Sequence, residues 1–168
     1  MKPKLDYKKF KPKDIHLIKA WLEHDRLGMK FLSSYATDDF VDLIDFKKRY
    51  LWIVYIENIP VGFFDFEIES NEKACFTFYV CQEVRGRGVG YELLQESLKL
   101  MEVRGTAILE GGVEKDNISS IRTLEKAGFR YTSINEDGNL AHKHKTRRSG
   151  IVSGSIPMVL NLGLLPCP

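Results

Sequence analysis

A glycine-rich stretch in the middle of the chain has the residue types needed to bind an anionic group. It spans Val84–Gly90, lies between an apolar run that ends near Cys81 and a helical pattern, and has a glycine at every second position. Glycine has no Cβ, so backbone N–H groups can turn inward together, and the free N–H groups of a helix start add to them. The stretch predicts a nest for a phosphate or pyrophosphate. A glycine-rich turn without a ligand is the alternative.

Two common phosphate-binding motifs do not fit this stretch. A P-loop is excluded because no Gly-Lys-Ser/Thr follows the glycines. A dinucleotide-binding Gly-x-Gly-x-x-Gly motif is excluded because the third glycine is displaced and no acidic residue ends a second strand at the right distance.

Residues 117–129 form a second patterned stretch. Asn117 is a good N-cap for a helix, and Gly128 is a good residue to follow its C-terminal end. By themselves these features predict only a well-formed helix.

Together the two stretches resemble the signatures of the GNAT superfamily of N-acetyltransferases. The acetyl-CoA loop of that family reads Arg/Gln-x-x-Gly-x-Gly/Ala, which Arg85, Gly88 and Gly90 match. The second signature, Asn-x-x-Ser-Ile-Arg-x-Leu-Glu-Lys-x-Gly-Phe, is close to residues 117–129. Both stretches occur in the family's order with one strand between them. The resemblance covers residues 10–140 and is closest to the branch of aminoglycoside 6′-N-acetyltransferases and ribosomal-protein N-terminal acetyltransferases.

The resemblance implies an α/β (α+β) GNAT fold over residues 1–145, followed by a tail of uncertain structure over 146–168. In that fold a mixed, mostly antiparallel sheet of six to seven strands carries about four helices, and strands 4 and 5 splay apart. The implied enzyme moves an acetyl group from acetyl-CoA to a primary amine of a small cationic molecule, such as an aminoglycoside. An N-terminal protein acetyltransferase and a non-catalytic acetyl-CoA-binding module are the alternatives.

The resemblance also implies which residues bind the cofactor. The strand before the glycines would line the pantetheine, and the backbone N–H near Val80 would donate to the thioester oxygen. The main chain of the glycine loop would hold the pyrophosphate. The expected cofactor-binding residues are Phe78, Tyr79, Val80, Arg85, Gly86, Arg87, Gly88, Val89, Gly90 and Asn117.

The general acid is a point where this sequence departs from the family pattern. Many members place a tyrosine, the acid for the leaving thiolate, where this chain has Leu124. Ser120, Tyr79 and Cys81 are the substitutes that remain, with Ser120 also expected near the reacting sulfur.

The general base is expected among the carboxylates of the strands. Residues 61–69 alternate, so that Asp65 and Glu67 share the face opposite Phe64 and Phe66. We take Glu67 as the first candidate and Asp65 as the second, with Glu110 on the strand over 107–113 as a further one. A row of solvated surface charges is the alternative.

Apolar periodicity and turn residues predict the elements that would position these residues. The expected helices are a first beginning at Asp14, a second over 37–49, a third from the glycine loop to Arg104, and a fourth over 118–128. Residues 28–36 are expected to be a loop with some helical turn. The expected strands are 5–10, 51–56, 61–69, 74–81, 107–113, one from Tyr131, and a weak one over 140–148.

Charge is distributed unevenly along the 168 residues. Residues 1–13 carry +5 and residues 141–150 carry +4, so the remainder carries −7 of the total charge of +2. An acidic body with basic ends favours a cationic small-molecule or peptide amine as partner and argues against a nucleic acid.

Several further features bear on metal binding and on the cellular compartment. Cys75, Cys81 and Cys167 lack metal-ligand spacing and a disulfide framework, and no apolar run reaches membrane-spanning length. His142 and His144 have no evident third ligand, so no metal is expected. We therefore expect a cytoplasmic protein without membrane attachment, either a monomer or a homodimer.

Overall fold

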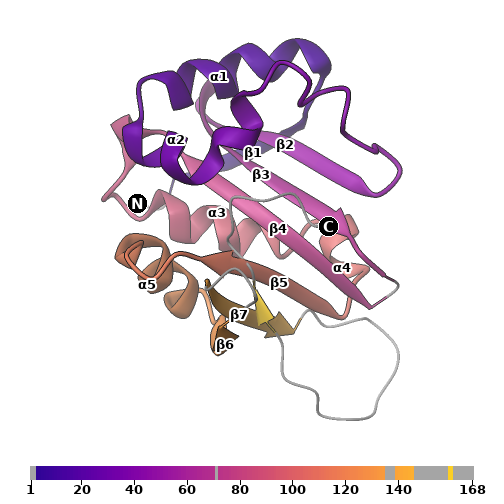
Figure 1. Ribbon diagram of the computed structural model, residues 1–168. Helices are drawn as coiled ribbons and strands as arrows, with labels where there is room; N and C mark the ends of the chain where they lie inside the picture. The colour runs from indigo at the N-terminus through magenta and orange to yellow at the C-terminus, as the bar shows by residue number, and fades with distance from the viewer. Residues whose placement is uncertain (1–2, 71, 135–138, 146–158, 161–168) are drawn as a thin grey trace.

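Eight strands form one mixed sheet in the computed structural model (Figure 1), which describes residues 3–70, 72–134, 139–145 and 159–160. The order is β1-β2-β3-β4-β5-β7-β6, with the short β8 beside β7. Neighbouring strands are antiparallel, except for the parallel pair β4 and β5. The strands are β1 (Leu5–Lys9), β2 (Arg49–Ile56), β3 (Ile59–Ile68), β4 (Lys73–Val80), β5 (Ile108–Val113), β6 (Arg130–Ile134), β7 (Leu140–Lys145) and β8 (Val159–Leu160). The predicted mixed, mostly antiparallel sheet is confirmed.

Helices cover both faces of this sheet. The α-helices are α1 (Ile15–Glu23), α2 (Arg26–Leu32), α3 (Val89–Ser97), α4 (Met101–Arg104) and α5 (Ile118–Lys126), and the 3₁₀ turns are η1 (Pro12–Asp14), η2 (Ser33–Ala36) and η3 (Gln82–Val84). Trp21 of α1 stacks on Tyr79 of β4, with ring centroids 5.9 Å apart. The next residue towards the N-terminus, Phe78, points to the opposite face, where it lies beside Gly90 of α3. The core therefore lies on both sides of the central strands.

The helix predicted over residues 37–49 is wrong. The segment forms separate turns up to residue 48, held by bonds such as Asp42 N–H to Asp39 C=O, and β2 begins at Arg49. Phe40 and Ile44 are buried while Leu43 is 71% exposed, so the apolar residues anchor isolated turns rather than one continuous helical face.

A helix forms instead at α2, within the region expected to be a loop with some helical turn. Asp25 begins it, because its carboxylate accepts the Gly28 N–H at 2.9 Å. The helix expected from the glycine loop to Arg104 is also divided, since α3 ends at Ser97 and α4 begins at Met101. Met101, the first residue of α4, is 83% exposed.

The end of the chain is described only in part. The sequence predicted a weak strand over 140–148, and the structure has β7 at Leu140–Lys145, hydrogen-bonded between β5 and β6. Of the predicted tail, 146–168, only the two residues of β8 are described, and Cys167 also lies outside the described residues. None of the helices in the described part combines the length and apolarity that crossing a membrane requires. In the same residues, no group of three His, Cys, Asp or Glu side chains could hold a metal ion.

Candidate active site

The parallel strands β4 and β5 pair only at their amino-terminal ends. The register runs from Lys73 opposite Ile108 to Cys75 opposite Glu110, and both strands then continue without pairing to each other. The predicted splay between these strands is therefore confirmed. It leaves the second half of β4 with one edge facing an opening instead of a strand.

The backbone of β4 presents hydrogen-bonding groups to this opening. The Cys81 N–H donates to the Val61 carbonyl at 2.8 Å, on the side of β3. Successive N–H groups along a strand point in opposite directions, so the Val80 N–H points away from β3 and towards the opening. The Val80 N–H is therefore in a position to be the donor expected near this residue, and its role at the thioester oxygen stays a prediction.

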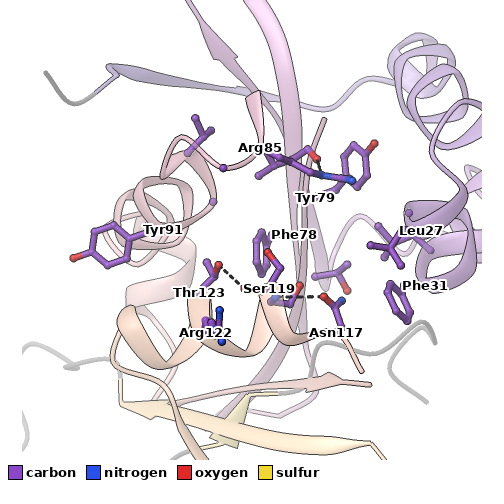
Figure 2. Close-up of a pocket in the computed structure, with 18 of the residues that line it drawn as sticks. Leu27, Phe31, Phe78, Tyr79, Arg85, Tyr91, Asn117, Ser119, Arg122 and Thr123 are labelled. Atoms are coloured by element: carbon purple, nitrogen blue, oxygen red, sulfur yellow. Dashed lines mark hydrogen bonds between the residues drawn. The ribbon is translucent and has the colours of Figure 1, made fainter. Parts of the chain in front are cut away.

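A cavity of ≈ 350 Å³ lies in this opening and is bordered by three helices, α2, α3 and α5 (Figure 2). Phe78 lies in its centre, α2 contributes Leu27 and Phe31 from one side, and α5 contributes Ser119 and Thr123 from another. Nine of the ten expected cofactor residues line it, namely Phe78, Tyr79, Val80, Arg85, Gly86, Gly88, Val89, Gly90 and Asn117, and so does Ser120. The structure thus brings the two sequence signatures to one cavity, while Arg87 lies outside its lining.

The glycine loop has a backbone that other residues rarely adopt. Gly86 and Gly88 have φ of +74° and +81°, and a Cβ on either would meet no atom within 4 Å. Gly88 is also the N-cap of α3, so the first N–H groups of that helix are directed at the same side of the cavity. Backbone dipoles and free space at a helix start make this the place in the cavity best suited to a phosphate group.

A buried carboxylate beneath the loop was missed in the sequence. Asp25, which is only 1% exposed, accepts hydrogen bonds from the Arg85 guanidinium, the Tyr79 hydroxyl at 2.9 Å and the Gly28 N–H. The Arg85 Nε also donates to the Val80 carbonyl at 2.8 Å. The guanidinium, which the sequence analysis expected at a phosphate, is thus directed at the protein itself and ties the loop to α2 and β4.

The same contacts set the ionisation of this network. Burial alone would raise the pKa of Asp25, but the hydrogen bonds from Arg85, Gly28 and Tyr79 outweigh it and lower the pKa to about 2. Burial and the neighbouring Asp25 carboxylate raise the pKa of Tyr79. Because the Tyr79 O–H is engaged with Asp25, its proton is aimed away from the centre of the cavity.

Asn117 has the structural role that its position predicts. Its Oδ1 accepts the Ser120 N–H at 3.3 Å, as an N-cap of α5 does. Asn117 and Ser120 both remain half-buried at the cavity wall. Cys81 was another candidate for the general acid. Its side chain is buried and does not line the cavity, and burial raises the pKa of its thiol to about 11.

Asp65, the second candidate for the general base, is not part of a solvated row of carboxylates, which was the alternative. Its side chain is buried, with its Oδ2 2.5 Å from Arg49 Nη2 and 2.6 Å from the Tyr35 hydroxyl. Both faces of the sheet are covered, so the face assigned to water lies under η2 and the turns after it. Asp65 is outside the cavity lining, and so is Glu110, whose carboxylate lies 2.6 Å from Lys73 Nζ.

Glu67 is more exposed than Asp65 on the same strand. It is half-buried, 3.8 Å from Arg49 Nη1, and outside the cavity lining. Burial raises the pKa of Glu67, and the Arg49 charge offsets part of that rise. A raised carboxyl pKa is a property of general bases that work near neutral pH, so the catalytic assignment of Glu67 stays a prediction.

Three charged residues of the cavity were not singled out in the sequence. Glu114, at the end of β5, and Arg122 and Lys126, on α5, all line it. Arg122 and Lys126 are part of the second signature and are four residues apart on the predicted helix, but neither was proposed to have a role in the site.

A mixed sheet that splays around a glycine loop and a helix start is the architecture of an acyl-CoA-dependent acetyltransferase. The family model described as the acetyltransferase (GNAT) family matches residues 17–129, most of the chain. The chain therefore belongs to the GNAT acetyltransferase family, as its two signatures indicated. No protein of curated function matches it in sequence.

Solved structures share this fold at low sequence identity. The aminoglycoside acetyltransferase AAC(6')-Ib, in complex with coenzyme A, is 14% identical with a TM-score of 0.72, over 86% of this chain and 96% of that one. Spermidine N-acetyltransferase from Vibrio cholerae, with CoA and spermine, is 15% identical with a TM-score of 0.68, over 83% and 92%. The Campylobacter jejuni N-acetyltransferase PseH, with acetyl coenzyme A, is 16% identical with a TM-score of 0.65, over 86% and 100%. At these identities the likeness establishes the fold alone.

Proposed function

We propose that this protein transfers the acetyl group of acetyl-CoA to a primary amine of a small cationic molecule. The observation that carries the proposal is the meeting of the glycine loop, the open edge of β4 and the start of α3 in one cavity. Membership of the acetyltransferase family supports the reaction class. The solved relatives that carry CoA together with kanamycin or spermine support the kind of acceptor.

The residues present fit acetyl-CoA. An extended chain such as pantetheine can lie along the unpaired edge of β4, where Phe78 and Val80 line the cavity. The pyrophosphate fits the nest between Gly86 and the start of α3, where a Cβ would otherwise occupy the open space. When bound, acetyl-CoA supplies an activated acyl group.

The chain's own groups would then assist the transfer. The acceptor nitrogen bonds to the acetyl carbon while the carbon–sulfur bond breaks and the sulfur leaves as a thiol. The Val80 N–H, directed into the opening, donates to the thioester oxygen as negative charge develops there. Glu67, which lies outside the cavity lining, is proposed to receive the proton of the amine through water, and Ser120 to deliver a proton to the sulfur and regain one from solvent.

The charges around the cavity favour a cationic acceptor at one end of it. Glu114 lines the cavity at this end, and Lys30 Nζ of α2 lies 2.9 Å from its carboxylate and 2.9 Å from that of Asp116, two residues further along the chain. Lys30 and the exposed Lys115 balance the two carboxylates, and of these four groups only the Glu114 carboxylate lines the cavity. An amine with several positive charges would be attracted here, and salt would weaken the attraction.

A screen of amines with release of free thiol as the readout tests the proposal. We expect acetylation of a polycationic amine, with an aminoglycoside as the first compound, and a KM that rises with ionic strength. Activity restricted to peptides with free N-termini would contradict the small-molecule acceptor and support the N-terminal protein acetyltransferase. Binding of acetyl-CoA without turnover of any amine would support the non-catalytic module.

A further inference from the structure

A hydroxyl group lines the cavity on the side of α1 and α2. Thr77 belongs to the half of β4 that no longer pairs with β5, and it is one of the residues of the cavity wall. Side chains alternate along a strand, so Thr77 points to the same face as Tyr79, which stacks on Trp21 of α1. Phe78 points to the other face, where it lies beside Gly90 of α3. Thr77 is therefore on the face of the sheet opposite α3.

Thr77 is connected to a buried network of polar groups. It lies directly opposite Asp65 in the ladder between β3 and β4. The Tyr35 hydroxyl, on η2, is 2.6 Å from Asp65 Oδ2 and is also hydrogen-bonded to Thr77. Arg49 Nη2 is 3.3 Å from the same hydroxyl, and Arg49 Nε is 3.1 and 3.0 Å from the two Asp65 oxygens. Tyr35, Asp65 and Arg49 are buried, so only the half-buried Thr77 brings the network to the cavity.

The chemistry of these groups fixes the direction of each hydrogen bond. Arg49 can only donate, and the Asp65 carboxylate beside it accepts, so the single proton of the Tyr35 hydroxyl is donated to Asp65. Burial and the Asp65 charge raise the pKa of Tyr35, so the hydroxyl keeps this proton. The Tyr35 oxygen is then an acceptor, and Thr77 must be the donor of the bond between them. The proton of Thr77 is thus directed into the protein, and its oxygen keeps a lone pair.

We infer that Thr77 accepts a hydrogen bond from an N–H of the acceptor amine and so positions the amine at the open edge of β4. This inference rests on the proposed acetyltransferase function. A hydroxyl that is free to rotate could donate to an anion, but the Thr77 hydroxyl is held as an acceptor and suits an N–H donor. A neutral amine held by one N–H keeps its nitrogen lone pair for attack on the acetyl carbon. Tyr35 and Asp65 do not line the cavity, so they act through Thr77 as positioning residues.

Steady-state kinetics of Thr77→Val test the inference, with kanamycin as the acceptor and spermine in a parallel series. Valine keeps the branched shape of threonine and removes the hydroxyl. We expect kcat/KM for the acceptor to fall about tenfold or more, the scale of one hydrogen bond to a charged group. The Kd of acetyl-CoA, measured by calorimetry, should be unchanged. Thr77→Ser should retain most of the wild-type kcat/KM, because serine keeps the hydroxyl.

Tyr35→Phe tests the direction of the Thr77 hydrogen bond, because phenylalanine keeps the ring and removes the oxygen to which Thr77 donates. The Thr77 proton can then turn to the cavity, so kcat/KM for the acceptor should fall, but less than in Thr77→Val, with the Kd of acetyl-CoA unchanged. Thr37→Val is the matched control. Thr37 is exposed and lies outside the cavity lining, and its hydroxyl donates to the Ser34 carbonyl at 3.0 Å.

Three outcomes would contradict the role of Thr77. An unchanged kcat/KM in Thr77→Val, with an active wild-type protein, would overturn this inference alone. So would a loss in Thr77→Ser as large as that in Thr77→Val, or a parallel loss of acetyl-CoA affinity, because either result would make the effect of the valine independent of the acceptor. Failure of the wild-type protein to acetylate either amine would overturn the proposed acceptor class and this inference with it.

Discussion

At the scale of the residue, Asp25 connects more of the site than any group that the motifs identified. It caps α2 through Gly28, holds Arg85 at the base of the glycine loop and accepts the Tyr79 hydroxyl. Removal of the charge would leave the Arg85 guanidinium without its anion in a partly buried position. We therefore treat Asp25 as a residue that positions the loop.

Asp25→Asn is expected to lower the free energy of unfolding by about 2 kcal/mol near neutral pH. The pKa of Asp25 in the folded protein, about 2, is below its ordinary value of 3.8. The carboxylate thus stabilises the fold above pH 3.8, and this contribution is lost as pH falls towards 2. Denaturant unfolding at pH 7 and in steps between pH 4 and 2 measures the difference, which should close over the acidic range.

The exposed neighbour Glu23 provides the control for Asp25. Glu23→Gln should leave the free energy of unfolding within about 0.5 kcal/mol of the wild-type value. A wild-type advantage over Asp25→Asn that stays constant from pH 7 to pH 2 would show that the carboxylate charge is not responsible.

Glu67→Gln keeps the shape of the side chain and removes its basicity. If Glu67 is the general base, kcat should fall about 100-fold or more, with KM little changed. Burial raises the pKa of Glu67, so the wild-type rate should increase with pH around a pKa above that of an ordinary glutamate. In Glu67→Gln this increase of the rate with pH should be absent. A decrease of only a few-fold, confined to KM, would reduce Glu67 to one charge among several.

At the scale of the element, the turn from β4 into α3 is built for close approach of a ligand to the backbone. Backbone N–H groups lie along one wall of the cavity for three reasons. Strand β4 ends there, Gly86 and Gly88 have positive φ, and the first N–H groups of α3 are free. A Cβ on Gly90 would lie 3.6 Å from both Phe78 and Thr123, at ordinary contact distance, so the fold itself tolerates a side chain there.

Gly88→Val and Gly90→Val are each expected to abolish the rise in melting temperature that acetyl-CoA causes in the wild-type protein. In Gly88→Val a branched side chain would be forced into positive φ, which strains the loop. In Gly90→Val the added methyl groups would enter the cavity. Gly105→Ala, at the end of α4 with an ordinary negative φ, is the control. Unchanged acetyl-CoA affinity in either valine variant would show that the loop is not the pyrophosphate site.

At the scale of the whole molecule, the cavity is lined by residues well before the end of the chain. Among the residues that the structure describes, the last that lines it is Lys126 on α5, and β6 and β7 then extend the sheet on the far side of β5. Strand β8 adds two residues beside β7. The division into a domain over 1–145 and a tail over 146–168 stays a prediction.

Truncation after Thr146 is expected to leave acetyl-CoA binding intact, because every described residue that lines the cavity is retained. Calorimetry gives the affinity, and light scattering gives the mass of the particle in solution. A loss of folding, or a change in oligomeric mass, would instead show that the tail completes the sheet or an interface.

The features that the sequence determined by itself are those governed by near neighbours. The conformations of Gly86 and Gly88 and the capping positions of Asn117 and Gly128 depend on a few consecutive dihedral angles. Asn117 caps α5, Gly128 has the positive φ of a residue that ends a helix, and Gly86 and Gly88 have positive φ. The strands were read correctly from apolar runs, because burial on the sheet depends on residue type along a short segment. The family signatures contain the same local information.

Only the tertiary structure decided which distant residues meet. The splay depends on where β4 stops pairing with a strand more than 30 residues away, and the contact of Asp25 with Arg85 joins residues 60 positions apart. Alternation shows that the two faces of β3 differ, but not which elements cover each face, so the burial of Asp65 could not be predicted from the sequence. Packing also decides which charges line the cavity, since Glu114 follows β5 and Lys126 lies on α5.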